Sequence, residues 1–286
     1  MKKPKTKVIA IVGPTASGKS DYAINLAKKI DADIISADSR LVYKGFDVLC
    51  AKPRIEEMQG IKHYMMDVVE PEVDFSVANF CDMAKDVIKD ITDRGKIPIV
   101  AGGTGLYFRI LLEDYDMPRV APNYDLRAEL EEKSAEELYG VLRQKDPKSA
   151  EKIHKNNKVK LIRAIEVCES LNMPMSEAAK RKENEYDVEW IGLNYTNRAD
   201  LYEKINNRVD KMLKMGAIEE TEFLLKKHGR ISNFVNTIGY KEILAYLDGL
   251  MSLDEAVEEL KKNTRRYAKR QLSWFRQNQN INWIMF

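Results

Sequence analysis

The sequence is poor in the residues that build disulfide frameworks and metal sites. It contains only three cysteines, Cys50, Cys81 and Cys168, and no two of them form a C-x-x-C pair. His63 and His154 are isolated, with no second ligand at metal spacing. A sparse, odd set of cysteines is typical of free thiols in a reducing compartment. This pattern argues against a disulfide-rich secreted fold and against a zinc site.

Long hydrophobic runs and a strong net charge are also missing. The basic start MKKPKTK is followed by an apolar run, residues 7–12, that is too short for a signal-peptide core or a membrane span. The net charge is only +2 over 286 residues, so the global balance does not by itself indicate a nucleic-acid partner. We expect a cytoplasmic monomer without a membrane partner, built as one large domain or two smaller ones.

The most informative feature that is present lies near the N-terminus. Residues 13–20 read GPTASGKS, which matches G-x-x-x-x-G-K-S, and they separate an apolar run from an amphipathic segment. Strand, glycine loop and helix in this order are the context of a phosphate-binding loop, or P-loop. Its backbone would surround a di- or triphosphate, Lys19 would add a positive charge, and Ser20 could hold Mg²⁺. The predicted diphosphate or nucleotide site is Gly13, Pro14, Thr15, Ala16, Ser17, Gly18, Lys19 and Ser20.

Strand and helix patterns alternate through the first third of the chain. Apolar runs at 33–36 and 97–101 flank a helical pattern at 77–94. This βαβ alternation predicts an α/β fold: a P-loop NTPase-like parallel sheet with covering helices. Ligands bind at the carboxyl ends of parallel strands. We therefore expect the P-loop, the loop at Asp38 and the loop 102–105 to converge.

The middle of the chain loses the strand signal. Helical patterns at 125–145, 159–171 and 176–182 follow one another there. We expect an inserted all-helical domain over 119–186, with the α/β core formed by 1–118 and 187–286. The second part of the core is predicted to hold strands at 188–194 and 281–285 and helices at 200–215, 217–227, 240–247 and 253–275.

Two polar residues follow the ends of predicted strands. A carboxylate at Asp38 could orient a nucleophile, take its proton or help hold magnesium, but Asp at a strand end also forms Asx turns and helix caps. Thr104 could donate to a phosphate oxygen, or it could belong to an ordinary strand-to-helix turn. The run 97–101 ends without the acid of a Walker B strand. That absence argues against a nucleotide-driven motor or switch.

A dense cluster of positive charge lies near the C-terminus. Seven cations and no acid fall between Lys261 and Arg276, with aromatic residues among them. A solvated helix usually mixes charge signs, so a phosphate backbone is the natural counter-surface. The alternative is an ordinary charged helix surface. Arg208, taken alone, is indistinguishable from a surface arginine.

Together these segments resemble the tRNA dimethylallyltransferases, also called tRNA isopentenyltransferases. The resemblance covers almost the whole chain. Its most selective parts are D-S-x-x-x-Y at 38–43, GGTGLY at 102–107 and YAKRQ-x-x-W at 267–274. It also runs through GPTASGKS at 13–20, DFSVANF at 74–80, IHKNNKVKLIRAIE at 153–166, NNRVDKML at 206–213 and TIGYKE at 237–242.

The resemblance implies transfer of a dimethylallyl group from dimethylallyl diphosphate to the exocyclic amine of the adenine 3′-adjacent to the anticodon in tRNA. The P-loop would hold the prenyl diphosphate, with Mg²⁺ as cofactor, and whether it also binds ATP stays open. By family position Asp38 accepts the proton of the amine, while Thr104 and Arg208 act around the diphosphate. The adenine must leave its stack to reach the site, as in other base-modifying enzymes.

The resemblance also implies a tRNA surface made by the core, the insertion and the basic C-terminal helix. Its residues are Asp38, Ser39, Arg40, Leu41, Thr104, Arg127, Val159, Lys160, Leu161, Ile162, Arg163, Thr237, Gly239, Tyr240, Arg265, Lys269 and Arg270. The chain departs from the common family pattern at Leu41, at Leu49-Cys50 and at Asn157, where Gln, Gly-Thr and Asp are frequent.

Three alternatives remain at this point. A P-loop kinase acting on a small molecule or nucleoside would use the same loop, but it needs ATP and has no need of a basic C-terminal helix. A relative that prenylates free adenine nucleotides would not need the helical insertion. A catalytically idle RNA-binding protein would not need Asp38 and Lys19 in complete motifs.

Overall fold

The computed structural model describes residues 5–113, 115–178, 180–181 and 184–286. The chain divides into two compact units. The core unit comprises Met1–Leu112 and Glu185–Phe286, and the insertion unit comprises Glu113–Asn184. Within the described ranges, none of the helices is both long and apolar enough to cross a bilayer.

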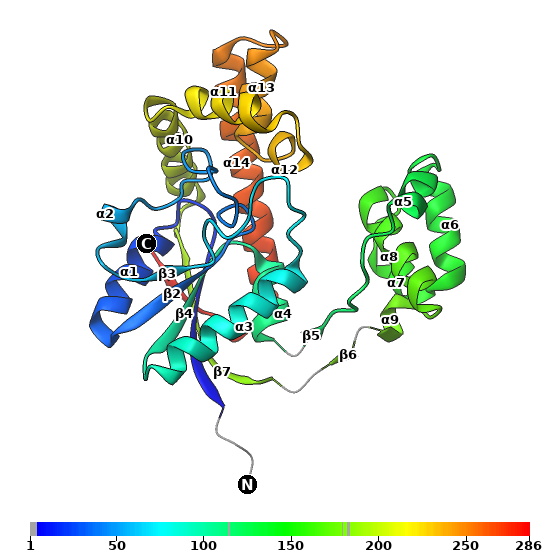
Figure 1. Ribbon diagram of the computed structural model, residues 1–286, viewed down its shortest axis with the longest axis horizontal. Helices are drawn as coiled ribbons and strands as arrows, with labels where there is room; N and C mark the ends of the chain where they lie inside the picture. The colour runs from blue at the N-terminus through cyan, green and yellow to red at the C-terminus, as the bar shows by residue number, and fades with distance from the viewer. Residues whose placement is uncertain (1–4, 114, 179, 182–183) are drawn as a thin grey trace. The chain divides into compact units, whose positions relative to one another are not determined.

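A six-stranded parallel sheet forms the centre of the core unit (Figure 1). The strand order is β3-β2-β4-β1-β7-β8. The predicted strands and the predicted α/β fold are confirmed, whereas the short strand β3 was not predicted. The strands are β1 (Thr6–Val12), β2 (Ala32–Ala37), β3 (His63–Tyr64), β4 (Ile97–Gly102), β7 (Tyr186–Asn194) and β8 (Asn282–Met285).

Both faces of the sheet are covered, which explains the continuous apolar runs in its central strands. Alternate side chains of β1 point to opposite faces. Ile9 and Ile11 pack with Ile24 of helix α1 (Lys19–Ile30). Helices α3 (Val77–Asp93) and α4 (Gly105–Leu112) pack against each other, and α3 contacts β2 and β4.

The helices predicted at 19–30 and 77–94 are confirmed as α1 and α3. Ser76 begins α3 because its hydroxyl accepts from the N–H of Asn79 while the Asn79 side chain accepts from the N–H of Ser76. Helix α4 and the short helix α2 (Ile55–Met58) were not predicted. Most of α4 is buried, so its sequence carries no polar face to reveal a helical period.

A layer of helices follows β7 and lies near the carboxyl ends of the strands (Figure 1). It confirms the four helices predicted after residue 200. The longest, α14, contacts α10, α13 and α4, so it runs from this layer back to the sheet. The members are α10 (Arg198–Lys214), α11 (Ala217–His228), α12 (Ser232–Val235), α13 (Tyr240–Leu247) and α14 (Leu253–Phe275).

Aromatic packing joins this helical layer to the loop that follows β2. The rings of Phe46, Phe234 and Tyr240 have centroids 4.9 to 6.3 Å apart and are fully buried. Such contacts add about 0.5–1.5 kcal/mol each beyond the burial of apolar area.

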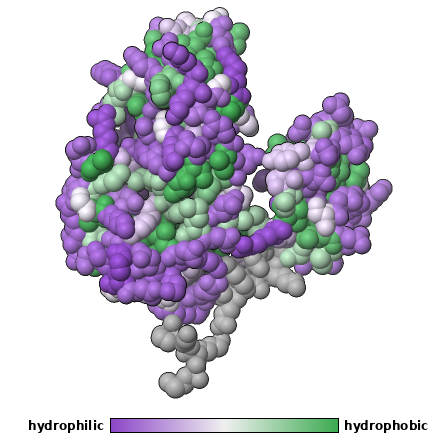
Figure 2. Space-filling view, viewed as in Figure 1, coloured by the Kyte–Doolittle hydropathy of each residue, from purple (hydrophilic) through white to green (hydrophobic). Residues whose placement is uncertain are grey.

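The outer surface of the core unit is mostly hydrophilic. Figure 2 shows hydrophilic side chains over most of its visible face, with apolar patches between them.

The insertion unit is helical and has its own apolar core. Leu138, Leu142, Leu161 and Ile165 are among its buried residues. Its helices are α5 (Tyr124–Glu131), α6 (Ala135–Lys145), α7 (Pro147–Lys152), α8 (Lys158–Leu171) and α9 (Met175–Ala178). An antiparallel two-stranded ribbon is formed by β5 (Tyr115–Asp116) and β6 (Lys180–Arg181).

Three expectations for this region were wrong in detail. The helix expected over 125–145 is two helices, because the Ser134 hydroxyl accepts from the N–H of Glu137 and starts a new one. The helix expected over 176–182 ends at Ala178, and β6 follows it; residues 179 and 182 lie outside the described residues. The ribbon, which depends on pairing between distant residues, makes the unit span 113–184 rather than 119–186.

The side chain of Glu166 on α8 binds the N-terminal end of α5 in the insertion unit. This side chain is fully buried and accepts from the N–H of Asn123 at 2.7 Å and from Arg127 at 2.8 and 2.9 Å. Arg163 also donates to it. Burial alone would raise the pKa of Glu166, but the hydrogen bonds from Arg127, Asn123 and Arg163 outweigh it and lower the pKa to about 2.

We predict that Glu166→Gln destabilises the insertion unit by about 3 kcal/mol at neutral pH, because it leaves two partly buried arginines uncompensated. The carboxylate contributes stability above its ordinary pKa of 4.5 and loses it as the pH falls through about 2. Urea unfolding at pH 7 and near pH 2.5 should therefore show a difference from wild type that shrinks in acid.

The matched control is Glu169→Gln on the same helix. Glu169 pairs with Lys145 at 2.7 Å, but both side chains are exposed. Its loss should change the unfolding free energy by less than about 0.5 kcal/mol. Equal effects of the two substitutions would refute the role assigned to Glu166.

Candidate active site

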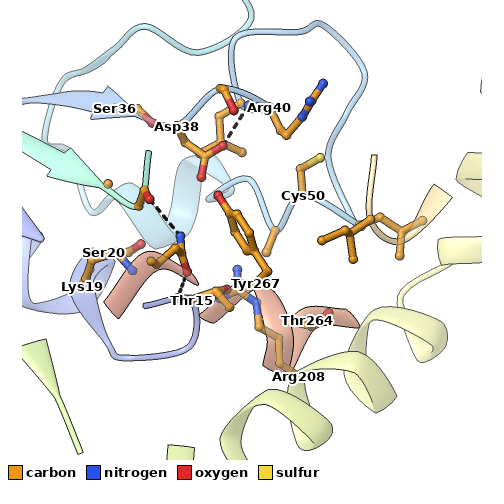
Figure 3. Close-up of a pocket in the computed structure, with 18 of the residues that line it drawn as sticks. Thr15, Lys19, Ser20, Ser36, Asp38, Arg40, Cys50, Arg208, Thr264 and Tyr267 are labelled. Atoms are coloured by element: carbon orange, nitrogen blue, oxygen red, sulfur yellow. Dashed lines mark hydrogen bonds between the residues drawn. The ribbon is translucent and has the colours of Figure 1, made fainter. Parts of the chain in front are cut away.

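A cavity of about 400 Å³ lies where β1, β2 and β4 end (Figure 3). Its wall includes P-loop residues, the segment 38–41 that follows β2, and Gly102 and Gly103 at the end of β4. One face each of α10 and α14 completes it. The predicted convergence of three loops is thus confirmed, and the volume lies in the range of small-ligand sites.

The P-loop backbone requires glycine at two of its positions, 13 and 18. A Cβ atom on Gly13 would lie 2.3 Å from the carbonyl oxygen of Leu193 on the neighbouring β7. Gly18 has φ of 82° and precedes α1 without a side-chain cap. The first N–H groups of a helix without such a cap are available to an anion.

Two cations from different elements flank this loop. The Lys19 ammonium donates to the carbonyl oxygen of Pro14 at 2.5 Å, and Arg208 on α10 donates to the Thr15 hydroxyl at 3.4 Å. Burial, followed by the charge of Arg208, lowers the pKa of Lys19 to about 7, although Asp38 opposes the shift. Burial also lowers the pKa of Arg208. A polyanion between these side chains would relieve this repulsion.

The sequence alone allowed the interpretation that Arg208 is a surface residue, and this interpretation is wrong. The side chain lines the cavity with Ile205, Val209 and Met212, which recur at helical spacing on α10. Arg208 therefore lies beside the P-loop, and its expected action around the diphosphate stays a prediction.

Asp38 forms the Asx turn that its sequence allowed, and its expected role as proton acceptor stays a prediction. One carboxylate oxygen accepts from the N–H of Arg40 at 2.8 Å, which is an Asx turn. Figure 3 shows the carboxylate at the cavity wall, on the side opposite Arg208. The turn therefore fixes the orientation of a carboxylate that lines the cavity.

Thr104 lies directly behind the cavity wall. Its hydroxyl accepts from the N–H of Ser39 at 3.1 Å, and its own N–H donates to the carbonyl oxygen of Ala37 at 3.2 Å. Both contacts tie the β4 loop to the Asp38 loop. Its expected contact with a diphosphate stays a prediction.

Comparison with known proteins decides the family. A family model described as IPP transferase matches residues 41–278. The tRNA dimethylallyltransferase of Anoxybacillus flavithermus is 47% identical over 281 residues, which cover 97% of this chain and 90% of that protein. The chain belongs to the tRNA dimethylallyltransferase family.

Solved structures agree with this family assignment. The tRNA isopentenylpyrophosphate transferase of Bacillus halodurans matches with a TM-score of 0.74 and 40% identity, over 98% of this chain and 90% of that one. A eukaryotic dimethylallyltransferase acting on tRNA matches with a TM-score of 0.84 and 29% identity, over 98% of this chain and 74% of that one.

The residues that family resemblance assigns to tRNA fall into two groups. In the core unit, six of them line the cavity: Asp38, Ser39, Arg40, Leu41, Thr237 and Arg270. In the insertion unit, Val159 and Lys160 are exposed at the start of α8, and Val159 is 80% exposed despite being apolar. Arg127 and Arg163 are engaged by Glu166.

Three of the residues assigned to tRNA have buried side chains, and their expected contact with tRNA stays a prediction. Leu161 and Ile162 are buried in the apolar core of the insertion unit, because they occupy the inner face of α8. Tyr240 is fully buried in the core unit, with its hydroxyl on Glu220. Beside it, Gly239 packs against Leu49: a Cβ there would lie 3.0 Å from the Leu49 side chain.

The basic face of α14 is narrower than its sequence suggested. Lys261 pairs with Asp210 at 2.9 Å and with Glu258, and Lys262 pairs with Glu259 at 2.8 Å. Arg265 donates to Asn206 at 2.7 Å and lies over the ring of Tyr202. The exposed cations Arg266, Lys269 and Arg270 remain on one face at i, i+3 and i+4.

Sequence reasoning missed four residues of α14 that line the cavity, among them Tyr267 and Gln271. Tyr267 projects from the helix toward Asp38 (Figure 3), and burial followed by the charge of Asp38 raises its pKa, so it remains a hydrogen-bond donor at neutral pH. Gln271 is buried and contacts two loops. The available signal was helical spacing, since Leu260, Thr264, Tyr267 and Gln271 share one face.

Glu220 on α11 supports the cavity from outside. Its carboxylate accepts from the N–H groups of Asp47, Val48 and Leu49 at 3.2, 2.6 and 3.2 Å, and from the Tyr240 hydroxyl at 2.7 Å. Leu49 and the residues after it line the cavity. A carboxylate that accepts several N–H groups in this way holds the loop in one conformation.

We predict that Glu220→Gln destabilises the protein by about 1–3 kcal/mol, because an amide cannot accept all of these hydrogen bonds. Hydrogen exchange of the backbone amides of residues 47–49 should become faster. The control Glu222→Gln changes an exposed residue of the same helix, and it should leave both the stability and the exchange unchanged. Slow exchange at 47–49 in the Glu220 variant would contradict the prediction.

Proposed function

We propose that this chain transfers a dimethylallyl group from dimethylallyl diphosphate to the exocyclic amine of the adenine 3′-adjacent to the anticodon in tRNA. One observation supports the proposal above all. A single cavity brings the P-loop, Lys19 and Arg208 into the same space as the Asp38 carboxylate. This arrangement offers a diphosphate site and a proton acceptor to the two reacting groups.

The geometry accounts for each change in bonding. The amine nitrogen of adenine attacks C1 of the dimethylallyl group, the C1–O bond breaks, and its electron pair leaves on the diphosphate. Asp38 accepts the proton released from the amine. Negative charge grows on the leaving group in the transition state, where Lys19, Arg208 and the P-loop amides stabilise it.

The residues present fit a magnesium ion that is held mainly by the diphosphate. Within the described residues no cluster of three or more His, Cys, Asp or Glu could hold a metal by itself. Mg²⁺ usually takes one or two protein ligands and completes its shell with phosphate oxygens and water. Ser20, the last residue of the P-loop, lines the cavity and would supply such a ligand. When bound, the ion would neutralise charge on the leaving diphosphate.

The tRNA partner is supported by the exposed cations of α14 and by Val159 and Lys160 of the insertion unit. The cavity lies inside the core unit, so an adenine within an RNA stem-loop must leave its stack to enter. The diphosphate of the donor is negatively charged, which matches the cations that line the cavity. The dimethylallyl group is apolar, which matches the apolar residues of α10 and α14 in the lining.

A transfer assay tests the reaction directly. Purified protein, Mg²⁺, labelled dimethylallyl diphosphate and unmodified tRNA are mixed, and a parallel reaction holds ATP without a prenyl donor. Label on the adenine beside the anticodon is expected. Consumption of ATP on a nucleoside or metabolite, with no label on tRNA, would favour a P-loop kinase instead.

We predict that Asp38→Asn lowers kcat by about 10²–10⁴-fold, since a positioned general base contributes this much. Dissociation constants for tRNA should stay within about threefold, because the amide keeps the size of the side chain and can still accept from Arg40. The control Asp31→Asn removes an exposed carboxylate just before the other end of β2. An unchanged kcat in the Asp38 variant would exclude it as the base.

We predict that Arg266→Gln combined with Lys269→Gln weakens tRNA binding and reduces its salt dependence. Each lost phosphate contact should lower the slope of log K against log salt by about 0.7–0.9. The control Lys89→Gln changes an exposed lysine of α3 that pairs with Asp93. Equal slopes for the double variant and wild type would place the RNA surface elsewhere.

A further inference from the structure

The motif YAKRQ-x-x-W on α14 contains two residues that the transfer reaction does not use directly, Gln271 and Trp274. They lie one helical turn apart, and both pack against the β4 loop. The Gln271 side chain is 5% exposed. Its position in the cavity wall, between the P-loop and the β4 loop, suggests a role in the architecture of the site.

The amide of Gln271 joins the P-loop to the β4 loop. Its oxygen accepts from the N–H of Thr15 in the P-loop at 2.8 Å, and its nitrogen donates to the carbonyl oxygen of Gly103 at 3.1 Å. The dashed line at Thr15 in Figure 3 marks the first of these bonds. The amide is therefore used at both ends, which fixes its orientation.

The connection continues from Gly103 to the proton acceptor. The next residue, Thr104, accepts from the N–H of Ser39, which directly follows Asp38. A continuous path of hydrogen bonds and short backbone segments thus runs from the diphosphate loop through Gln271 and Thr104 to the base. The length of this path sets the distance between the P-loop and the Asp38 loop.

The glycines of the β4 loop allow α14 to approach this closely. A Cβ on Gly103 would lie 2.1 Å from the Gln271 amide nitrogen, and a Cβ on Gly105 would lie 2.1 Å from the Trp274 ring. The backbone of Gly103 is outside the left-handed region, so space rather than conformation requires glycine there. Helix α14 therefore contacts the β4 loop closely at Gly103 and at Gly105.

We propose that Gln271 is a positioning residue that sets the distance between the P-loop and the Asp38 loop. The inference rests on the proposed function. C1 of the donor and the adenine amine must approach within about 3–3.5 Å in line, and a misplacement of about 1 Å costs on the order of 10²-fold in rate. Gln271 therefore acts on the transfer step and has little effect on the binding of either substrate.

The test is a double-mutant cycle of Gln271→Ala and Gly103→Ala. Gln271→Ala should lower kcat by about 10–100-fold, with dissociation constants within about threefold for tRNA and for the unreactive dimethylallyl S-thiolodiphosphate. Gly103→Ala should lower kcat because the new methyl group displaces the Gln271 amide. The double variant should be no slower than Gln271→Ala alone, since the methyl group then has room.

Two outcomes of this cycle would overturn the proposal. If the two losses in kcat multiply in the double variant, Gly103 and Gln271 do not act through their contact. If Gln271→Ala weakens binding of the thiolodiphosphate as much as it lowers kcat, the residue serves donor binding and not positioning.

The control Ser252→Ala separates positioning from general weakening of α14. Ser252 caps the far end of this helix by accepting from the N–H of Glu255 at 3.3 Å. Its loss should lower the melting temperature by about 2–4 °C and leave kcat within about twofold of wild type. A fall in kcat equal to that of Gln271→Ala would show that loss of helix stability explains both.

Hydrogen exchange in the free protein keeps this inference separate from the proposed function. The Thr15 amide should exchange slowly in wild type and in Ser252→Ala and faster in Gln271→Ala. Equal exchange in all three overturns the positioning contact, whatever the reaction is. If Thr15 exchanges as expected in all three proteins but wild type transfers no dimethylallyl group, the proposed function fails while the contact stands.

Discussion

The alignment of β1, β4 and β2 at one edge of the sheet is the constraint on which the site depends. Val12 and Ala37 both pair with Gly102, so the three strands end at the same level. A Cβ on Gly102 would lie 2.2 Å from the carbonyl oxygen of Ala37. Only glycine allows this close approach. It brings the Asp38 loop and the β4 loop within hydrogen-bonding distance of each other, and the P-loop ends at the same edge.

Positive charge exceeds negative charge at this edge of the sheet, which favours the binding of a diphosphate. Burial, followed by the nearby charge of Arg208, lowers the pKa of Lys19. Asp38 offsets only part of this shift. A bound polyanion would favour the charged form of Lys19, so affinity for the donor and stabilisation of the leaving group have the same electrostatic origin.

Helix α14 serves two functions on two of its faces. Tyr267 and Gln271 point into the cavity and hold its loops, while Arg266 and Lys269 are exposed to solvent. Lys261 and Lys262 of the same helix are paired with Asp210 and Glu259. One rigid element thus connects the surface proposed for RNA with the loops that surround the chemistry.

The sequence by itself determined the strand–loop–helix order of the P-loop, the parallel sheet and the helical nature of the insertion. These follow from local signals: GPTASGKS forms its own turn, and the apolar runs report burial on both faces of a sheet. Only the tertiary structure decided that Arg208 reaches Thr15, that Gln271 bridges Thr15 to Gly103, and that β5 pairs with β6. Those contacts join residues far apart in the chain, and helical spacing alone does not say which element a side chain will face.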